Sequence, residues 1–160
     1  MTRKMFAVIG VATVAVLLII ATSRVLAEET GRCYVTVTTP HTGDRAGVDV
    51  LVTGKAVVAP GNSLWAFARR RGLLSAWPQA GGAIVPDLAG NYSVLVVLGT
   101  PNETGDFEVF IQVVDAVQNA KLETWFRQAE LTGRYPGMPV PPFVAGCGVP
   151  TTLTLTKTSN

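Results

Sequence analysis

Apolar and polar positions alternate along most of the chain after residue 33, which is the pattern of strands with one buried face and one solvated face. Gly, Pro, Asn and Asp separate these runs and predict turns. The predicted strands cover residues 34–39, 48–52 with a continuation to 58, 64–68, 74–77, 92–98, 107–114 and 149–156. The run 107–114 is apolar on both faces apart from Glu108 and Gln112, so it should lie centrally in a sheet. About seven strands with short connections predict a sandwich of two antiparallel sheets.

The periodicity changes after residue 115. Apolar residues then fall at i, i+3, i+4 and i+7 on one helical stripe, namely Leu122, Trp125, Phe126 and Ala129. Asp115 is a suitable N-cap, Gln118 completes a pattern like a capping box, and Gly133 is a natural C-cap. The sequence therefore predicts one helix over about residues 116–132, inserted before the last strand, with its aromatic residues packed against a sheet edge.

Residues 134–143 (RYPGMPVPPF) contain too many prolines for a helix or a central strand. We expect this segment to run extended as a strap over a sheet edge on its way to the last strand. The alternative is that its apolar surface docks a partner.

The first 27 residues have the pattern of a secretory signal peptide. Arg3 and Lys4 precede an uncharged run from Met5 to Ser23. Val25 and Ala27 then lie three residues and one residue before a cleavage point between Ala27 and Glu28. The alternative is an uncleaved transmembrane anchor, because 19 uncharged residues nearly span a bilayer core. Both interpretations place the domain formed by residues 28–160 outside the cytoplasm, either secreted or anchored to the membrane.

Two cysteines lie at opposite ends of this domain, Cys33 at its start and Cys147 close to its end. In an oxidising compartment such a pair is most simply a disulfide between the terminal strands. A reactive thiol is the alternative, but neither Cys has a nearby His or a second Cys in a CxxC pair. We therefore predict a structural disulfide.

Charge excludes one class of partner. The chain holds 13 basic and 11 acidic residues, but three of the basic ones lie in the first 27 residues, so the domain has ten against 11. A domain with no general positive field is not expected to bind nucleic acid.

A resemblance to a known kind of module is carried by five segments of the chain, namely VTVTTPHTG, VDVLVTGKAVVAPGNSLWAF, WPQ, DLAGNYSVLVVLG and TGDFEVFIQVVD. Together they resemble immunoglobulin-like β-sandwich modules of exported or membrane-tethered bacterial proteins, over about residues 34–115. The shared features are a strand-Pro-x-x-Gly turn, a V-x-G-x-A strand, Leu-Trp, and a D-x-x-G-x-aromatic hairpin. The resemblance implies an all-β fold with the C-terminal helix as an elaboration, and a role in adhesion, assembly or ligand presentation without catalytic residues.

Few residues could support catalysis. A Ser-His-Asp triad would need the one histidine, His41, which lies in a turn-like segment, and no serine is in a nucleophile-elbow context. Paired carboxylates could come from six residues, namely Asp44, Asp49, Asp87, Glu103, Asp106 and Glu108. Four of them, Asp44, Asp87, Glu103 and Asp106, lie in or beside turns, where acidic residues commonly bind local backbone. No D-x-D-x-D spacing indicates a metal site. We expect no catalytic residue, metal or cofactor.

The candidate binding surface combines positive charge with aromatic rings, since Arg beside aromatics can hold anionic partners. Its residues are Arg69, Arg70, Arg71, Trp65, Trp77 and Tyr135. The alternative for the arginine run is a solvated loop that protects a strand end from aggregation.

These observations predict an exported, non-catalytic immunoglobulin-like module that acts in binding, adhesion or assembly at the cell envelope. Its partner would be protein or glycan, with membrane contact through residues 1–27 if they are uncleaved. One alternative is a small extracytoplasmic hydrolase that uses loop carboxylates, and another is a membrane-anchored subunit of an envelope complex. Two opposed carboxylates in a deep pocket would favour the hydrolase, and a flat surface with exposed Trp and Arg would favour binding.

Overall fold

The structure, a computed structural model, describes residues 33–159. The predicted signal peptide or anchor and its cleavage point between Ala27 and Glu28 lie outside these residues. Over the range from 33 to 159, no helix is both long and apolar enough to cross a membrane.

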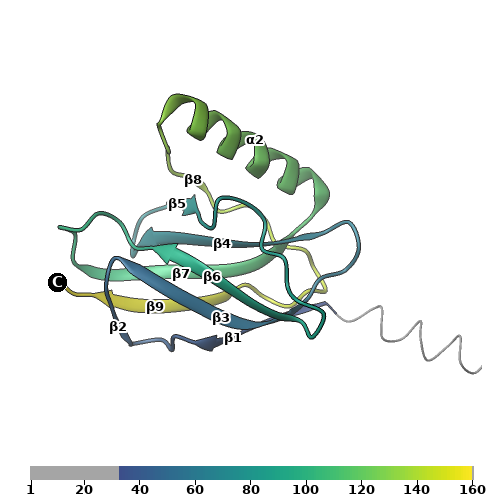
Figure 1. The fold of residues 1–160 in the computed structure, drawn as a ribbon, viewed down its shortest axis with the longest axis horizontal. Coiled ribbons are helices and arrows are strands. Elements are labelled where there is room, and N and C mark those ends of the chain that lie inside the picture. Colours follow the sequence, from purple (N-terminus) through teal and green to yellow (C-terminus); the bar gives the residue numbers. More distant parts are fainter. Residues whose placement is uncertain (1–32, 160) are drawn as a thin grey trace, which may run out of the picture. The chain divides into compact units, whose positions relative to one another are not determined.

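The chain folds into two β-sheets and one C-terminal helix (Figure 1). The three-stranded sheet has the order β1-β3-β6, with β1 (Tyr34–Thr39), β3 (Asp49–Val57) and β6 (Asn91–Val97). The six-stranded sheet has the order β2-β9-β7-β4-β5-β8. Its strands are β2 (Arg45–Ala46), β4 (Ser63–Arg70), β5 (Ser75–Pro78), β7 (Gly105–Val114), β8 (Met138–Pro139) and β9 (Thr151–Lys157). This arrangement confirms the predicted mostly-β sandwich, with β7 central in its sheet.

The main core lies between the two sheets and follows from the period of two in each strand. In β6 the side chains of Tyr92, Val94 and Val96 are buried, whereas those of Ser93 and Leu95 are exposed. The central strand β7 and its neighbour β9 present their own alternate residues to the same core. The core thus has the interdigitated apolar layer that the alternation predicts.

The predicted disulfide is present and joins Cys33 to Cys147 across a sequence separation of 114 residues. Cys33 directly precedes β1 of the three-stranded sheet, and Cys147 precedes β9 of the six-stranded sheet. The bond therefore links the two sheets covalently.

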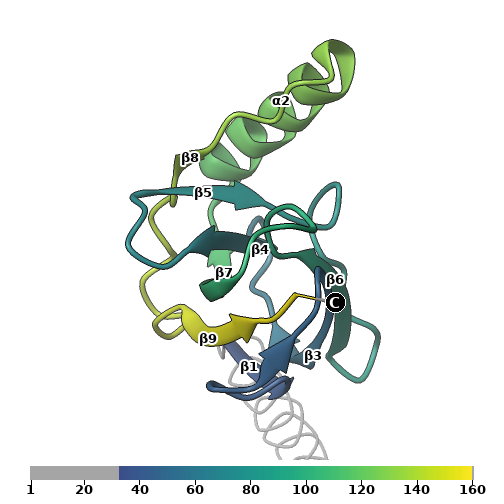
Figure 2. The same cartoon turned by 90° about the vertical axis from the view of Figure 1, so that its left-hand side faces the viewer.

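Helix α2 (Ala116–Thr132) has the predicted bounds and caps. The Asp115 carboxylate accepts a hydrogen bond from the backbone N–H of Gln118 at 2.7 Å, and Gly133 ends the helix with φ +63°. In Figure 2 the helix lies on the side of the six-stranded sheet that faces away from β1 and β3. A second apolar cluster fills this layer, made of Trp65, Phe67, Ala76, Phe110, Val114 and Leu122, with Phe126 packed against it.

The proline-rich segment is the predicted strap. Its two-residue strand β8 pairs with β5 at the edge of the six-stranded sheet. The strap is then fixed to β7, because the side-chain amide of Gln112 donates to the Pro141 carbonyl at 2.8 Å and the Val144 N–H donates to the Val113 carbonyl at 3.0 Å. Neither β8 nor the parallel pairing of β2 with β9 was predicted from the sequence.

Candidate functional site

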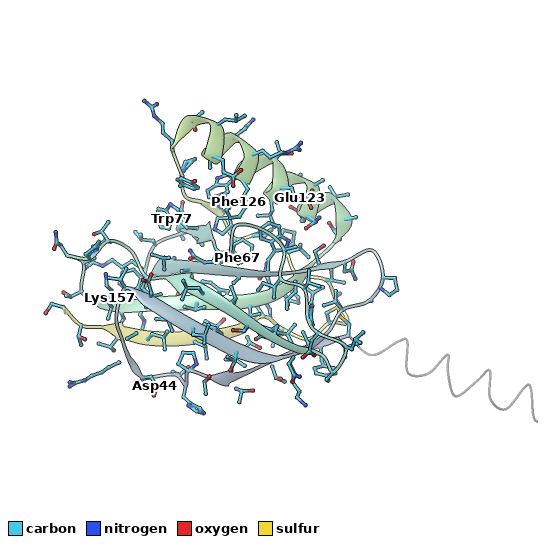
Figure 3. The ribbon with its side chains drawn as sticks, viewed as in Figure 1. Asp44, Phe67, Trp77, Glu123, Phe126 and Lys157 are labelled. Atoms are coloured by element: carbon cyan, nitrogen blue, oxygen red, sulfur yellow. A yellow bond between two sulfur atoms is a disulfide. The ribbon has the colours of Figure 1, made fainter. Side chains whose placement is uncertain are left out.

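A hollow of about 640 Å³ opens where β4 and β5 meet the loop that follows β6. Its apolar wall is formed by Leu73, Trp77, Val97, Phe107, Trp125 and Tyr135, and we call it the aromatic hollow. These residues come from the β4–β5 connection, three strands, the helix and the start of the strap. Figure 3 shows Trp77 at β5, and its pairing with Ala68 of β4 places its side chain on the face of the sheet that holds the inner core. The size lies within the range of small-molecule binding sites.

Two indole N–H groups hold the start of the strap. The Trp77 ring donates to the carbonyl of Tyr135 at 2.9 Å, and the Trp125 ring donates to the carbonyl of Pro136 at 3.1 Å. Gly137 permits this close approach, since a Cβ there would lie only 3.0 Å from the Trp77 ring. The Trp125 and Tyr135 rings meet edge to face with centroids 6.0 Å apart. These contacts fix the rings and leave their apolar surfaces to line the aromatic hollow.

The opposite wall is the loop between β6 and β7, which Thr100 organises. The Thr100 N–H donates to the Glu103 carboxylate at 2.6 Å, and the Thr100 carbonyl accepts from the Glu103 N–H at 3.1 Å and from the buried ammonium of Lys157. Gly99 has φ +61°, and a Cβ there would collide with the Glu103 carboxylate. The hydrogen bond from the Thr100 backbone, with smaller contributions from Lys157 and Arg70, lowers the pKa of Glu103 below its ordinary value.

The three consecutive arginines have three different environments, because alternate strand positions face opposite sides of a sheet. Arg69 pairs with Glu108 at 2.7 Å and lies over the Phe110 ring at 4.6 Å. Arg71 pairs with Asp106 at 3.4 Å outside the hollow. Arg70 lines the aromatic hollow and forms no ion pair with any residue from 33 to 159. The arginine run is therefore not a uniform solvated loop, and of its three members only Arg70 reaches the hollow without an ion-pair partner among residues 33–159.

Four of the six residues proposed from the sequence lie together at the aromatic hollow, namely Arg69, Arg70, Trp77 and Tyr135. Arg71 lies outside it. Trp65 does not belong to any surface, because its side chain is fully buried beneath α2 and its indole N–H donates to Asn119 at 2.8 Å. It faces the outer side of its sheet, and the sequence could not show that a helix covers that side.

Trp125, Glu103 and Phe107 also line the hollow, and none of them was predicted from the sequence to do so. Trp125 was predicted to pack against a sheet edge because it is in the apolar stripe of α2, and it is half-buried there. Its position one residue before the inward-facing Phe126 was the available signal, since two adjacent helical residues cannot both point straight at the sheet. Nothing in the sequence indicated that the loop at Glu103 would meet the helix layer at one site.

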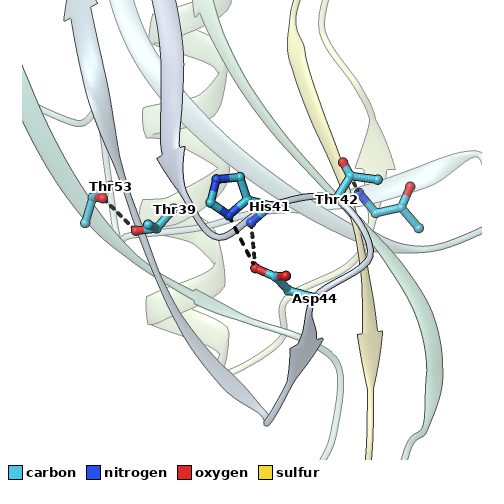
Figure 4. A network of polar contacts seen from close by, with 6 residues as sticks. Thr39, His41, Thr42, Asp44 and Thr53 are labelled. Atoms are coloured by element: carbon cyan, nitrogen blue, oxygen red, sulfur yellow. Dashed lines mark hydrogen bonds and ion pairs between the residues drawn. The ribbon is translucent and has the colours of Figure 1, made fainter.

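His41 takes part in a network of polar contacts with Asp44 in the turn before β2 (Figure 4). The Asp44 carboxylate accepts from the His41 backbone N–H at 2.7 Å and lies 3.8 Å from the imidazole, whose side chain is 77% exposed. Nearby, the hydroxyl groups of Thr39 and Thr53 are 2.8 Å apart. The Asp44 contact closes the turn before β2, which agrees with the predicted solvated position of His41.

Asp44, Asp87 and Glu103 bind local backbone, as predicted for carboxylates in turns, whereas Asp106 binds the side chains of distant residues instead. Asp87 accepts from the backbone N–H groups of Ala89 at 2.9 Å and Asn91 at 2.8 Å, and its hydrogen bonds to Asn91 lower its pKa. Asp106 accepts from the Thr156 hydroxyl at 2.9 Å as well as pairing with Arg71. Within the described part of the chain, no group of three or more His, Cys, Asp or Glu residues is arranged to hold a metal ion.

No model of a known protein family matches the chain, and no curated protein matches it either. The fold defines the class directly, as a mostly-β protein with two sheets and one C-terminal helix. The disulfide is consistent with a location outside the cytoplasm.

Proposed function

We propose that this protein is an exported, non-catalytic immunoglobulin-like module that binds a ligand at the cell envelope. Residues 1–27 direct export and either leave as a signal peptide or stay as an anchor, and residues 28–160 form the binding domain. The aromatic hollow is the observation that supports binding most strongly, since it combines fixed aromatic rings with an arginine that has no ion-pair partner among the described residues, in a cavity of ligand size.

The motifs behind the immunoglobulin-like assignment contact one another. The Tyr92 side chain lies across Gly54, where a Cβ would collide with its ring, and its hydroxyl donates to the Thr36 carbonyl at 3.0 Å. Gly90 has φ +78° and its carbonyl accepts from the Ala56 N–H at 2.8 Å. The V-x-G-x-A strand and the D-x-x-G-x-aromatic hairpin thus form one packing unit, which supports the assignment.

The carboxylates favour binding over hydrolysis. A glycoside hydrolase of the usual kind needs two carboxyl groups that face each other across the substrate, one of them protonated at working pH. The aromatic hollow has one carboxylate, Glu103, and its lowered pKa keeps it ionised. Glu108 on β7 is held by Arg69. The site is a hollow and not the flat surface expected for a binding module, but it lacks the opposed pair that would favour the hydrolase.

The location is tested by the intact mass of the protein recovered from its own cells, before and after reduction and alkylation. A chain that begins at Glu28, or a full chain in the membrane fraction that an impermeant reagent labels from outside, supports the proposal. Both cysteines should resist alkylation until they are reduced. A full-length chain in the cytosol with two reactive thiols would contradict it.

The binding site is tested with a photo-crosslinking amino acid at one of two exposed leucines. Leu74 is beside Leu73 at the mouth of the aromatic hollow, and Leu88 is at the opposite end of β6. We expect an adduct in living cells from position 74 and none from position 88, with its chemistry read by mass spectrometry. Equal labelling from both positions, or none from position 74, would contradict a site at the aromatic hollow.

A further inference from the structure

We infer that the aromatic hollow binds an amphiphile, a molecule with an apolar body and a single anionic group such as a carboxylate or phosphate. This inference rests on the proposed binding function and names the chemical class of the ligand. It follows from three properties of the hollow, which are the use of its polar groups, the balance of its charges and the exposure of its mouth.

The indole N–H groups and the buried amide of the wall already have hydrogen-bond partners within the protein. The N–H groups of Trp77 and Trp125 donate to the strap. The buried amide of Gln79 donates to the Trp77 carbonyl at 3.0 Å and accepts from the Val97 N–H at 2.9 Å. A ligand rich in hydroxyl groups would leave its own donors and acceptors unpaired against such a wall, which costs binding free energy. The wall therefore favours an apolar body over a sugar.

The charges leave one positive group for the ligand. Arg69 and Glu108 neutralise each other at 2.7 Å. The Glu103 carboxylate accepts from the Thr100 N–H, which lowers its pKa with smaller contributions from the charges of Lys157 and Arg70, and among residues 33–159 it forms no ion pair with Arg70. Arg70 remains, with a guanidinium that can bind a carboxylate or phosphate through two parallel hydrogen bonds. One unpaired cation selects one anionic group.

The mouth of the hollow exposes apolar surface that such a ligand would cover. Leu73 is 45% exposed and Tyr135 is 51% exposed, and both line the hollow. Leu74 beside them is 89% exposed. Apolar residues grouped at the entrance of a cavity are typical of a binding site. The anionic end of the ligand would meet Arg70, and its apolar body would lie against Trp77 and Phe107.

The test uses the full chain in nanodiscs of zwitterionic lipid, with dodecanoate and dodecanol as matched ligands and a brominated fatty acid as the contact quencher of tryptophan fluorescence. We expect the brominated acid to quench the fluorescence saturably and dodecanoate to displace it. The affinity for dodecanoate should exceed that for dodecanol by about tenfold or more, because an ionic hydrogen-bonded contact contributes binding free energy on this scale. Arg70→Gln should remove the preference for the acid. Arg71→Gln is the matched control and should keep it within about twofold.

The anionic ligand could be a membrane lipid or a soluble acid. A second set of nanodiscs that contain an anionic phospholipid distinguishes these two sources. If the membrane lipid is the ligand, these nanodiscs lower the affinity for dodecanoate in the wild type and not in the Arg70→Gln variant. If the ligand is a soluble acid, the two nanodiscs give the same affinity. Either result supports an anionic amphiphile.

The inference is overturned if dodecanoate and dodecanol bind equally, if neither binds, or if Arg70→Gln and Arg71→Gln have the same effect. A crosslinked peptide or glycan at position 74 with no binding of dodecanoate would refute the amphiphile and leave the proposed binding function standing. Equal crosslinking at positions 74 and 88 would refute the proposed function itself, so the two failures are distinguishable.

Discussion

The two faces of the six-stranded sheet are covered in different ways. Its inner face packs on the three-stranded sheet through aliphatic side chains, and a disulfide joins the two sheets. Its outer face packs on one helix and one proline-rich strap, through a few aromatic anchors and single hydrogen bonds such as those from Trp65 to Asn119 and from Gln112 to Pro141. The inner layer is a closed core, and the outer layer is a cover fixed at several points.

This difference explains where the candidate site lies. Helix α2 buries only Leu122 and Ala129 completely, while Trp125 and Phe126 remain half-buried. A helix with so narrow a buried stripe cannot cover the whole sheet face. At the edge of that cover, where the helix, the strap and the loop after β6 meet, the aromatic hollow stays open. Stability therefore comes mainly from the inner layer, and the outer layer adds Trp125 and Tyr135 to a site that also includes Phe107 of the inner core.

The largest expected effect comes from removal of the disulfide that closes the inner layer. The double variant Cys33→Ala/Cys147→Ala should lose about 4 kcal/mol of unfolding free energy, because the bond closes a loop of more than 100 residues in the unfolded chain. Chemical denaturation of the full chain measures this loss. Reduction of the wild type should give the same shift, and a double variant with the wild-type midpoint would show that the bond does not stabilise the sandwich.

A matched pair of leucines compares the two layers directly. Leu155 in β9 and Leu122 in α2 are both fully buried, in the inner and outer clusters respectively. We expect Leu155→Ala to cost about 4 kcal/mol and Leu122→Ala about 2 to 3 kcal/mol, because a helix held at few points can move to fill part of the cavity. Equal losses in denaturation midpoints would refute the idea that the outer layer is the more adaptable one.

The same contrast separates what could be predicted from the sequence from what could not. The strands of the inner layer follow from a period of two, and the helix bounds follow from Asp115 and Gly133, because both signals are local. The disulfide followed from the position of two cysteines at the ends of the domain. Each of these predictions needed only the residues of the element concerned.

The site depended on contacts between distant segments. Trp65 and Trp77 are 12 positions apart on neighbouring strands and look alike in the sequence, but Trp65 is buried under α2 and Trp77 lines the hollow. The run of three arginines looked like one patch until pairing with Glu108 and Asp106 removed two of its charges. The charge that remains on Arg70 is set by the register of β4 against β7, which no local pattern fixes.

A smaller effect is expected at the first turn of α2. Asp115→Ala should destabilise the protein by about 1 kcal/mol, because it removes the acceptor for the Gln118 N–H at the helix start. Lys121→Ala on the exposed side of the same helix is the control, with an expected change of less than about 0.5 kcal/mol. Differential scanning calorimetry of both variants checks the prediction, and a loss as large as that of Leu122→Ala would show that the cap holds the layer more than packing does.

The smallest effect concerns Glu103, and it depends on pH. Its pKa in the folded protein is lower than the ordinary value of 4.5, mainly because its carboxylate accepts from the Thr100 backbone N–H. The stabilisation by the ionised form is therefore fully present above that ordinary value and is lost as the pH falls through the lower folded pKa. Glu103→Gln should be slightly less stable than the wild type at neutral pH, with the difference shrinking in acid, whereas Glu130→Gln on the exposed face of α2 should match the wild type.

The Glu103→Gln variant also tests how the loop and the site are connected. Glu103 is the only acidic residue that lines the hollow in the described part of the chain, so its loss should raise the affinity for an anionic ligand while the loop becomes less stable. Parallel measurements of melting temperature and dodecanoate affinity check the two effects. A fall in both would mean that the loop geometry held by Glu103 matters more for binding than its negative charge does.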